Sequence, residues 1–136
     1  MGQWQSNGVT VILSRENALT RRVIGLAIEV HRYLGPGLLE SAYEECLCFE
    51  LKRGSISFAR QVPLRVEYKG AKIDCSYRAD LIVGEAVLLE LKAVDRLTPL
   101  HQAQLLTYLR LSRLKVGLLM NFNAVVLRDG LRRFVL

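Results

Sequence analysis

A short run of the chain, residues 86–92, carries an acid and a base at a spacing that allows chemistry. Side chains of an extended strand alternate between two faces, so Glu90 and Lys92 share one face while the neighbouring leucines share the other. Asp80 lies in the preceding extended run, and a tight turn at Gly84–Glu85 brings it opposite Glu90 to within about one residue of register. The pattern therefore predicts two carboxylates and an ammonium group converging on one site.

Two neighbouring carboxylates repel each other unless a cation lies between them, and hard oxygen ligands on a partly open site suit Mg²⁺ or Mn²⁺. Such an ion could polarise a phosphodiester and lower the pKa of a water molecule, while Lys92 would orient that water or stabilise charge building on the phosphate. The arrangement predicts metal-dependent hydrolysis. The alternative is that Asp80, Glu90 and Lys92 form the solvated face of a half-buried hairpin, where an exposed ion pair contributes little.

Two helices are predicted before this region. From about Asn17, apolar residues recur at helical spacing until Gly35–Pro36–Gly37 interrupts the pattern. A second helix is predicted from about Leu38 to Arg53, with Gly54 as its stop, so that the two helices form a hairpin. The residues of the second helix that are predicted to turn inward are Leu39, Tyr43, Cys46, Leu47 and Leu51.

The hydrophobic period then changes to that of strands. Short β-type runs, separated by turn residues, predict an antiparallel meander over 57–61, 64–68, 71–77, 79–83 and 86–92. Thr98 as a capping residue followed by Pro99 predicts a third helix over 100–113. Further strands are predicted over 116–121, 124–127 and 131–135, the last two joined by a hairpin at Asp129–Gly130.

The composition favours one domain with an anionic partner. Residues 1–136 are expected to form a single domain, with 1–13 as a leader of uncertain structure. Lys and Arg number 19 against 13 Asp and Glu, and the net charge of +6, spread along the chain, favours nucleic acid as a partner. Three cysteines without a C-x-x-C pair indicate reduced thiols rather than a disulfide framework or a zinc site. With no membrane-length apolar run and no signal peptide, a cytoplasmic protein is expected.

The order of these features resembles a known nuclease signature. Asp80, a hairpin turn, Glu90–Leu91–Lys92 and then a helix are similar to the D…(D/E)-x-K pattern of the PD-(D/E)XK nuclease superfamily. Residues 37–43, Gly-Leu-Leu-Glu-Ser-Ala-Tyr, resemble the defining G-x-x-E-x-x-Y string of the GxxExxY family within it. The resemblance runs from about Ile24 to Phe134 and takes in residues 29–31, 35–37, 77–80, 104–108, 117–118 and 121–122. Ala79 stands where the superfamily has the proline that names it, but that proline supplies no ligand.

The resemblance implies an α/β fold with a restriction-endonuclease-like core. Its central mixed β-sheet would be flanked by helices in the order α-α-β-β-β-α-β, followed by a C-terminal hairpin. Asp80 and Glu90 become the metal ligands, helped by the Leu91 carbonyl, with Lys92 as the catalytic base or charge stabiliser. Glu40 would add a water-mediated or second-metal ligand, unless it is an ordinary acid favoured at a helix start.

Further residues would assist this site. Gln104 and Tyr108, one helical turn apart, resemble the Q-x-x-x-Y pair of RecB-like nucleases and would position phosphate or brace the lysine. Without the resemblance, Tyr108 would be taken as core and Gln104 as surface. Arg78, His101 and Tyr43 are auxiliary candidates, although a histidine such as His101 is more often structural than a proton carrier.

These features together predict a nuclease that depends on Mg²⁺ or Mn²⁺ and hydrolyses phosphodiester bonds of nucleic acid, with DNA as the expected substrate. A basic groove beside the acidic cluster would guide the backbone. One alternative is a non-catalytic nucleic-acid- or protein-binding module on the same fold, and another is a structural interaction domain whose charge gives solubility. So small a core has no separate target-reading domain, so sequence specificity would need a partner or a homodimer.

Overall fold

The computed structural model describes residues 14–136, so the predicted leader over 1–13 lies outside the described residues. The chain forms a five-stranded sheet with strand order β1-β2-β3-β4-β5. Neighbouring strands are antiparallel except β3 and β4, which are parallel, so the sheet is mixed as predicted. The elements are α2 Ser14–Leu34, α3 Glu40–Arg53, β1 Phe58–Tyr68, β2 Ala71–Val83, β3 Val87–Lys92, α4 Pro99–Ser112, β4 Val116–Asn121, the 3₁₀ helix η2 Leu127–Gly130 and β5 Leu131–Val135.

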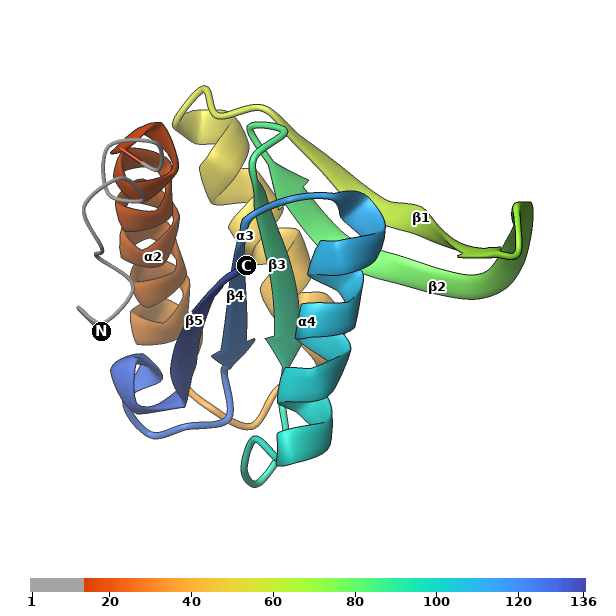
Figure 1. The fold of residues 1–136 in the computed structure, drawn as a ribbon. Coiled ribbons are helices and arrows are strands. Elements are labelled where there is room, and N and C mark those ends of the chain that lie inside the picture. Colours follow the sequence, from red (N-terminus) through yellow and green to blue (C-terminus); the bar gives the residue numbers. More distant parts are fainter. Residues whose placement is uncertain (1–13) are drawn as a thin grey trace.

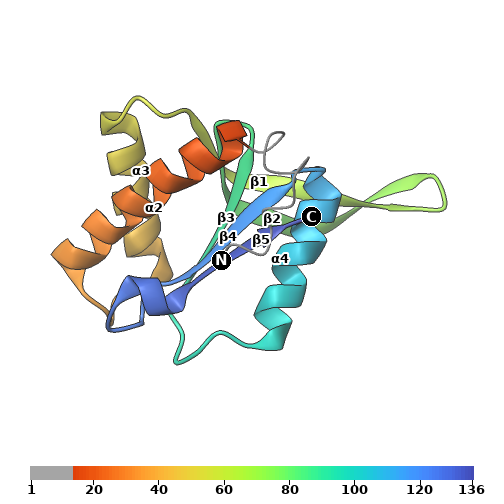
Figure 2. The ribbon, with the colours of Figure 1, turned by 60° about the vertical axis from the view of Figure 1, so that its left-hand side comes forward.

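Helices cover both faces of this sheet (Figures 1 and 2). The α2–α3 hairpin packs on one face, in a core that includes Val23, Leu47 and Leu89. Helix α4 packs on the other face, where Leu88 and Leu105 share a second core, and it supplies the crossover that the parallel pair β3–β4 requires. The fold is the helix-flanked, restriction-endonuclease-like α/β class that the sequence predicted. No helix within residues 14–136 is long and apolar enough to cross a membrane.

Helix α3 begins two residues later than predicted. Gly37 has a φ of +101°, and Leu39 precedes the helix in an extended conformation, so the helical hydrogen bonds start only at Glu40. Leu39 is therefore not on the inward face of the helix, and with 76% of its surface exposed its predicted burial is wrong. The other residues predicted to turn inward do contribute to the core: Tyr43, Leu47 and Leu51 are fully buried, and Cys46 packs against them partly buried.

Strands β1 and β2 are longer than the separate runs predicted from the sequence. Pro63 does not divide β1, because β1 is the edge strand of the sheet, where a proline is tolerated. The two strands continue as a ribbon beyond the paired residues Leu64 and Tyr77 and project away from the body of the protein (Figures 1 and 2). We call residues 65–76, which include the turn at Lys69–Gly70, the arm.

The C-terminal hairpin predicted at Asp129–Gly130 is wrong. Residues 124–127 do not form a strand, and η2 leads directly into β5, which pairs antiparallel with β4. Because β5 lies beside β4 itself, the residues between these strands must serve as a connecting loop rather than as a strand of their own. The His31 ring nitrogen lies 2.7 Å from the Ala124 carbonyl oxygen, which ties this loop to α2.

Two local features of the sequence are confirmed next to the site. Gly84 and Glu85 both have positive φ, and the Ala86 N–H donates to the Val83 carbonyl at 3.0 Å, the pattern of a type I′ hairpin turn. Thr98 caps α4, since its hydroxyl oxygen accepts from the backbone N–H of His101 at 3.3 Å. The first feature sets the register of β3 against β2, and the second fixes where α4 leaves the sheet.

The close packing of Gly130 gives a prediction of stability. A Cβ atom at Gly130 would lie 2.5 Å from the Asn121 carbonyl oxygen, a backbone atom that cannot rotate away. We expect Gly130→Ala to lower the free energy of unfolding by about 1–3 kcal/mol, measured by urea denaturation. The matched control is Gly25→Ala on the exposed side of α2, where no atom lies within 4 Å, and it should raise stability by about 0.5–1 kcal/mol. Equal effects of the two changes would contradict the packing at Gly130.

Candidate functional site

Asp80 and Glu90 meet where the pairing of β2 with β3 stops. Leu81 pairs with Leu89, and the same register places Asp80 opposite Glu90. Here the side chains replace the backbone ladder: the Asp80 N–H donates to Glu90 Oε2 at 2.8 Å, and the Leu91 N–H donates to Asp80 Oδ2 at 2.9 Å. Each carboxylate thus binds the backbone of the opposite strand. The two acids are held side by side at a break in the sheet.

The pairing of β2 with β1 is interrupted at the same residue. The paired residues on either side leave out Asp80 and its neighbour Gln61, which has a φ of +48°. Ala79 packs in the α4 core and Leu81 in the helix-hairpin core, so β2 changes face at Asp80. The Gln61 amide donates to Asp80 Oδ1 at 3.4 Å. Both neighbouring strands therefore contribute a side chain to Asp80 where their ladders open.

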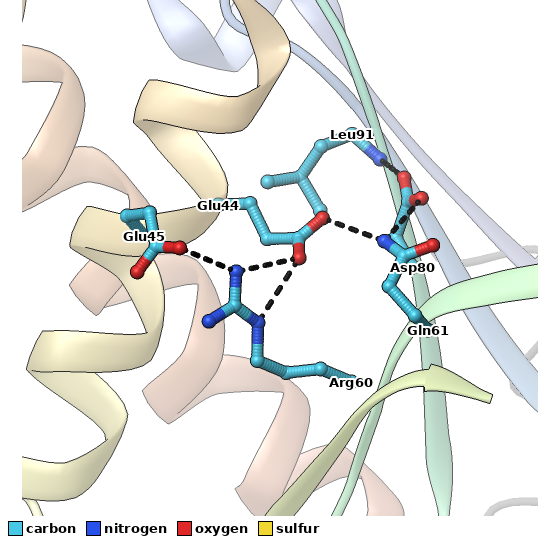
Figure 3. A network of polar contacts seen from close by, with 6 residues as sticks. All are labelled: Glu44, Glu45, Arg60, Gln61, Asp80 and Leu91. Carbon is cyan, nitrogen blue, oxygen red and sulfur yellow. Dashed lines mark hydrogen bonds and ion pairs between the residues drawn. The ribbon is translucent and has the colours of Figure 1, made fainter.

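Sequence reasoning missed a further acid near this break, Glu44 on α3. The residue is only 9% exposed, and its carboxylate accepts hydrogen bonds from Arg60 at 2.9 and 3.1 Å and from Gln61 at 3.0 Å. Figure 3 shows the Arg60 guanidinium between the carboxylates of Glu44 and Glu45. Gln61 links Glu44 to Asp80, so this network braces one side of the acid pair.

A signal for Glu44 was present in the sequence. It lies four residues after Glu40 and between the predicted inward positions Tyr43 and Leu47, so it occupies the buried side of an amphipathic helix. A buried acid requires a partner. The identity of that partner, Arg60, could not be read from the sequence because it comes from a strand 16 residues away.

Burial and mutual repulsion dominate the electrostatics of the pair. The pKa of Glu90 is raised from 4.5 to about 8, first by burial and then by the neighbouring Asp80 carboxylate. The pKa of Asp80 is also raised, mainly by burial, against the lowering effect of the Leu91 hydrogen bond. Lys92 lowers both pKa values, but its charge does not outweigh burial. The metal-free protein therefore favours a protonated Glu90 at neutral pH.

Lys92 and Glu40 lie at the end of β3 beside this pair. Lys92 is the last residue of the strand and is partly exposed. Glu40, the first residue of α3, is exposed, and its Oε2 accepts from the Ala93 N–H at 3.3 Å. Its charge raises the pKa of Glu90, as expected of a nearby acid. Leu91 is buried in the helix-hairpin core and pairs with Met120 of β4. Its backbone N–H donates to the Asp80 carboxylate.

The candidates on α4 and β2 differ in their burial. Tyr108 is partly buried, and its pKa is raised by burial and then by the Glu90 charge. Its ring lies 6.0 Å from that of Tyr77. Gln104, one turn earlier on α4, and Arg78, on β2 opposite Pro63, are both exposed. Tyr108 is therefore near enough to the acid pair for the charges of Glu90 and Asp80 to raise its pKa.

Two further candidates have structural partners. The His101 Nδ1 accepts from the Thr98 N–H at 3.1 Å, which completes the cap of α4. The Tyr43 hydroxyl donates to the Gly35 carbonyl at 2.6 Å and accepts from the Leu38 N–H at 3.1 Å, and its ring stacks on Phe122 at 4.6 Å. Tyr43 is fully buried, so it holds the turn that precedes Glu40 and does not reach the acid pair.

The donor set fits a divalent cation with few protein ligands. No group of three or more His, Cys, Asp or Glu within residues 14–136 is arranged to hold a metal ion. Asp80 and Glu90 nevertheless each use one oxygen on the opposite backbone, and Glu90 Oε1 takes no hydrogen bond among the described residues. Mg²⁺ is commonly held by one or two carboxylates, with water and phosphate completing its coordination. The two carboxylates of Asp80 and Glu90, with the raised pKa of Glu90, suit an ion of that kind.

Comparison with known proteins gives one match. A family model described as the PD-(D/E)XK nuclease superfamily matches residues 17–134. No curated protein and no solved structure matches the chain. The matched range covers almost the whole described structure, including the acid pair, most of α2, and all of α3 and α4.

The raised pKa of Glu90 predicts a pH dependence of stability. Because Glu90 ionises near 4.5 when unfolded and near 8 when folded, its favourable contribution is complete below 4.5 and is lost as pH rises through 8. Without metal, the free energy of unfolding should fall by an amount on the order of a few kcal/mol between pH 5 and pH 9. Urea denaturation in the presence of EDTA, repeated at each pH, measures this fall in the free energy of unfolding. Glu90→Gln, which keeps an acceptor oxygen, should show a flatter profile, and identical profiles would refute the shift.

The contacts of Tyr43 predict a structural role. Tyr43→Phe removes the hydroxyl that joins Gly35 and Leu38, and we expect the free energy of unfolding to fall by about 1–2 kcal/mol. The matched control is Tyr33→Phe, since Tyr33 is 88% exposed and should change stability by less than about 0.5 kcal/mol. Thermal denaturation of both variants makes the comparison. A Tyr43→Phe protein as stable as the control would show that this hydroxyl does not hold the turn.

Proposed function

The chain belongs to the PD-(D/E)XK nuclease superfamily, and we propose that it is a metal-dependent nuclease that hydrolyses phosphodiester bonds of nucleic acid. The observation that carries this proposal is the Asp80–Glu90 pair at the break in the sheet, with Lys92 two residues further along β3. The string Gly37 to Tyr43 supports a narrower proposal, that the chain is a GxxExxY protein.

We propose that Asp80 and Glu90 hold the cation, Mg²⁺ or Mn²⁺. The Leu91 carbonyl and Glu40 are the further ligands we propose, and the contact of Glu40 with the Ala93 N–H supports its approach to this end of β3. When bound, the ion would supply Lewis-acid activation of the phosphodiester and of the attacking water. The hydrogen bonds from Asp80 N–H and Leu91 N–H fix the two carboxylates before any ion binds.

Further residues of the chain act on the phosphate or position the acids. Lys92 orients the attacking water or stabilises charge that develops on the phosphate. Tyr108 and Gln104 position the phosphate or brace Lys92, with Arg78 and His101 as auxiliary residues. Arg60 neutralises Glu44, and Gln61 bridges Glu44 and Asp80, so these residues position Asp80.

We propose DNA as the substrate, and the net charge of +6 supports a polyanionic one. Residues 1–136 would act as a single domain, and a homodimer is one way in which so small a chain could gain sequence specificity. The second candidate function is a non-catalytic nucleic-acid- or protein-binding module. It is favoured by one observation, that one oxygen of each acid is already engaged and no third acid completes a metal-binding cluster among the described residues.

A cleavage assay separates these two functions. Supercoiled plasmid and labelled oligonucleotides would be incubated with the parent protein in Mg²⁺, Mn²⁺ or EDTA. We expect cleavage with either metal and none in EDTA. In Asp80→Asn and Lys92→Ala the cleavage rate should fall by about 100-fold or more. Lys52→Ala, an exposed lysine at the end of α3, is the matched control and should keep the parental rate.

Binding measurements on the same variants complete the test. If Asp80→Asn and Lys92→Ala bind nucleic acid but do not cleave it, the enzymatic function stands. A parent protein that binds nucleic acid and cleaves none with either metal is a binding module instead. Cleavage that persists in both variants would place the active residues elsewhere.

A further inference from the structure

A groove between the arm and the end of α4 gathers positive charge away from the acid pair. It has a volume of about 650 Å³ and is lined by residues of β1, β2 and the last turn of α4. The lining residues are Pro63, Arg65, Glu67, Lys72, Arg110, Leu111 and Arg113. Four of these side chains are cationic and one is acidic, so the groove presents a strongly basic surface.

The four cations of this groove form no ion pairs with the acids that the structure describes. Arg65, Lys72, Arg110 and Arg113 are absent from the ion pairs within residues 14–136, although Lys72 lies opposite Glu67 in the β1–β2 pairing. Arg110 donates one hydrogen bond, to the Thr107 hydroxyl at 3.1 Å. All four residues are exposed. Like charges gathered in this way repel one another, and an anionic ligand relieves the repulsion.

The arm contributes little to the core of the protein. Every arm residue except Val66 is exposed, and β2 pairs with β3 only through residues 81–83. The arm is thus a two-stranded ribbon without a third strand, and such ribbons are marginally stable alone. Figures 1 and 2 both show it projecting beyond the sheet, with the C-terminal end of α4 near its base. Its shape suits contact with a partner better than support of the fold.

Strand β1 and helix α4, which form walls of the groove, also carry residues close to the acid pair. On β1, Arg65 lies four residues after Gln61, which corresponds to about 13 Å of strand. On α4, Tyr108 lies about half a turn before Arg110, and its ring lies 6.0 Å from that of Tyr77 at the base of the arm. A nucleic-acid strand advances about 3.4 Å per nucleotide, so the first wall spans about four nucleotides. A strand bound along β1 would therefore need about four nucleotides to extend from Arg65 to the level of Gln61, which donates to Asp80.

We propose that this groove binds the phosphodiester backbone of nucleic acid through Arg65, Lys72, Arg110 and Arg113 and leads it to Asp80 and Glu90. The sequence predicted a basic groove without naming its residues, and these four side chains give it a location. The binding of the backbone stands on the geometry and charge of the groove. Its delivery to the acid pair rests on the proposed nuclease function.

The test compares two double charge reversals with equal net charge. Arg65→Glu/Arg110→Glu changes both walls of the groove, and the control Arg21→Glu/Arg53→Glu changes exposed residues of α2 and α3. Fluorescence anisotropy in EDTA measures binding of labelled duplex and single-stranded DNA over a range of KCl concentrations. We expect the groove variant to bind about tenfold more weakly or worse and its salt slope to fall by about two, while the control stays within about threefold of the parent.

Lys72→Glu provides an independent single variant on the arm, with thermal denaturation to verify that each protein folds. It should also weaken binding, by about threefold or more. Comparing the two DNA forms shows which of them the groove prefers. If the groove variants bind as tightly as the control, or if the parent binds neither DNA form at low salt, the proposal is overturned.

The same variants separate this proposal from the nuclease function. Loss of binding in the groove variants of a protein that cleaves nothing would support the groove and refute the enzyme. Cleavage at the parental rate by groove variants with unchanged binding would support the enzyme and refute the groove. When both proposals hold, the groove variants should raise KM for DNA far more than they lower kcat.

Discussion

The exchange of hydrogen bonds between the Asp80 and Glu90 carboxylates and the backbone of the opposite strand is the constraint on which the site depends. A sheet normally satisfies its N–H groups with carbonyls, and an unsatisfied buried N–H is costly. Here the ladders on both sides of Asp80 are open, and carboxylate oxygens accept the N–H groups of Asp80 and Leu91 between β2 and β3. The same contacts bring two acids together in a buried place, where burial and the Asp80 charge raise the pKa of Glu90 to about 8. The fold thus maintains a pair of acids whose ionised form a cation would stabilise.

The helix hairpin supports this arrangement from one face. Tyr43 joins the two ends of the Gly35–Leu38 turn and stacks on Phe122, which follows β4. This clamp places the start of α3, and so Glu40 and Glu44, next to the open end of β3. Much of the G-x-x-E-x-x-Y string therefore has a structural meaning: the glycine permits a turn with positive φ, the tyrosine closes it, and the glutamate between them reaches the strand. A motif of this kind marks a position in the fold as much as a chemical role.

The net charge of +6 is distributed unevenly, which matters more than its size. Acids gather where β1, β2 and β3 open, and Arg60 is bound there to Glu44 and Glu45. Four cations and one acid line the groove at the arm. A polyanion would be attracted to the groove and repelled by the acids unless a metal ion neutralised them. Affinity for the backbone and chemistry at the phosphate would therefore belong to different residues, with Tyr77 and Tyr108 in contact between them.

The sequence by itself determined the features that depend on near neighbours: the periods of α2, α3 and α4, the Thr98 cap, the Gly84–Glu85 turn and, through that turn, the approach of Asp80 to Glu90. Tertiary structure decided the rest, because those features depend on residues far apart in the chain. The Arg60 partner of Glu44, the continuation of β1 through Pro63, and the pairing of β5 with β4 in place of a hairpin at Asp129–Gly130 all arise from packing between distant segments. Periodicity predicts which face of an element is apolar, whereas contacts across the sheet determine which residues pack against that face. A site built from three strands and a helix depends on those contacts.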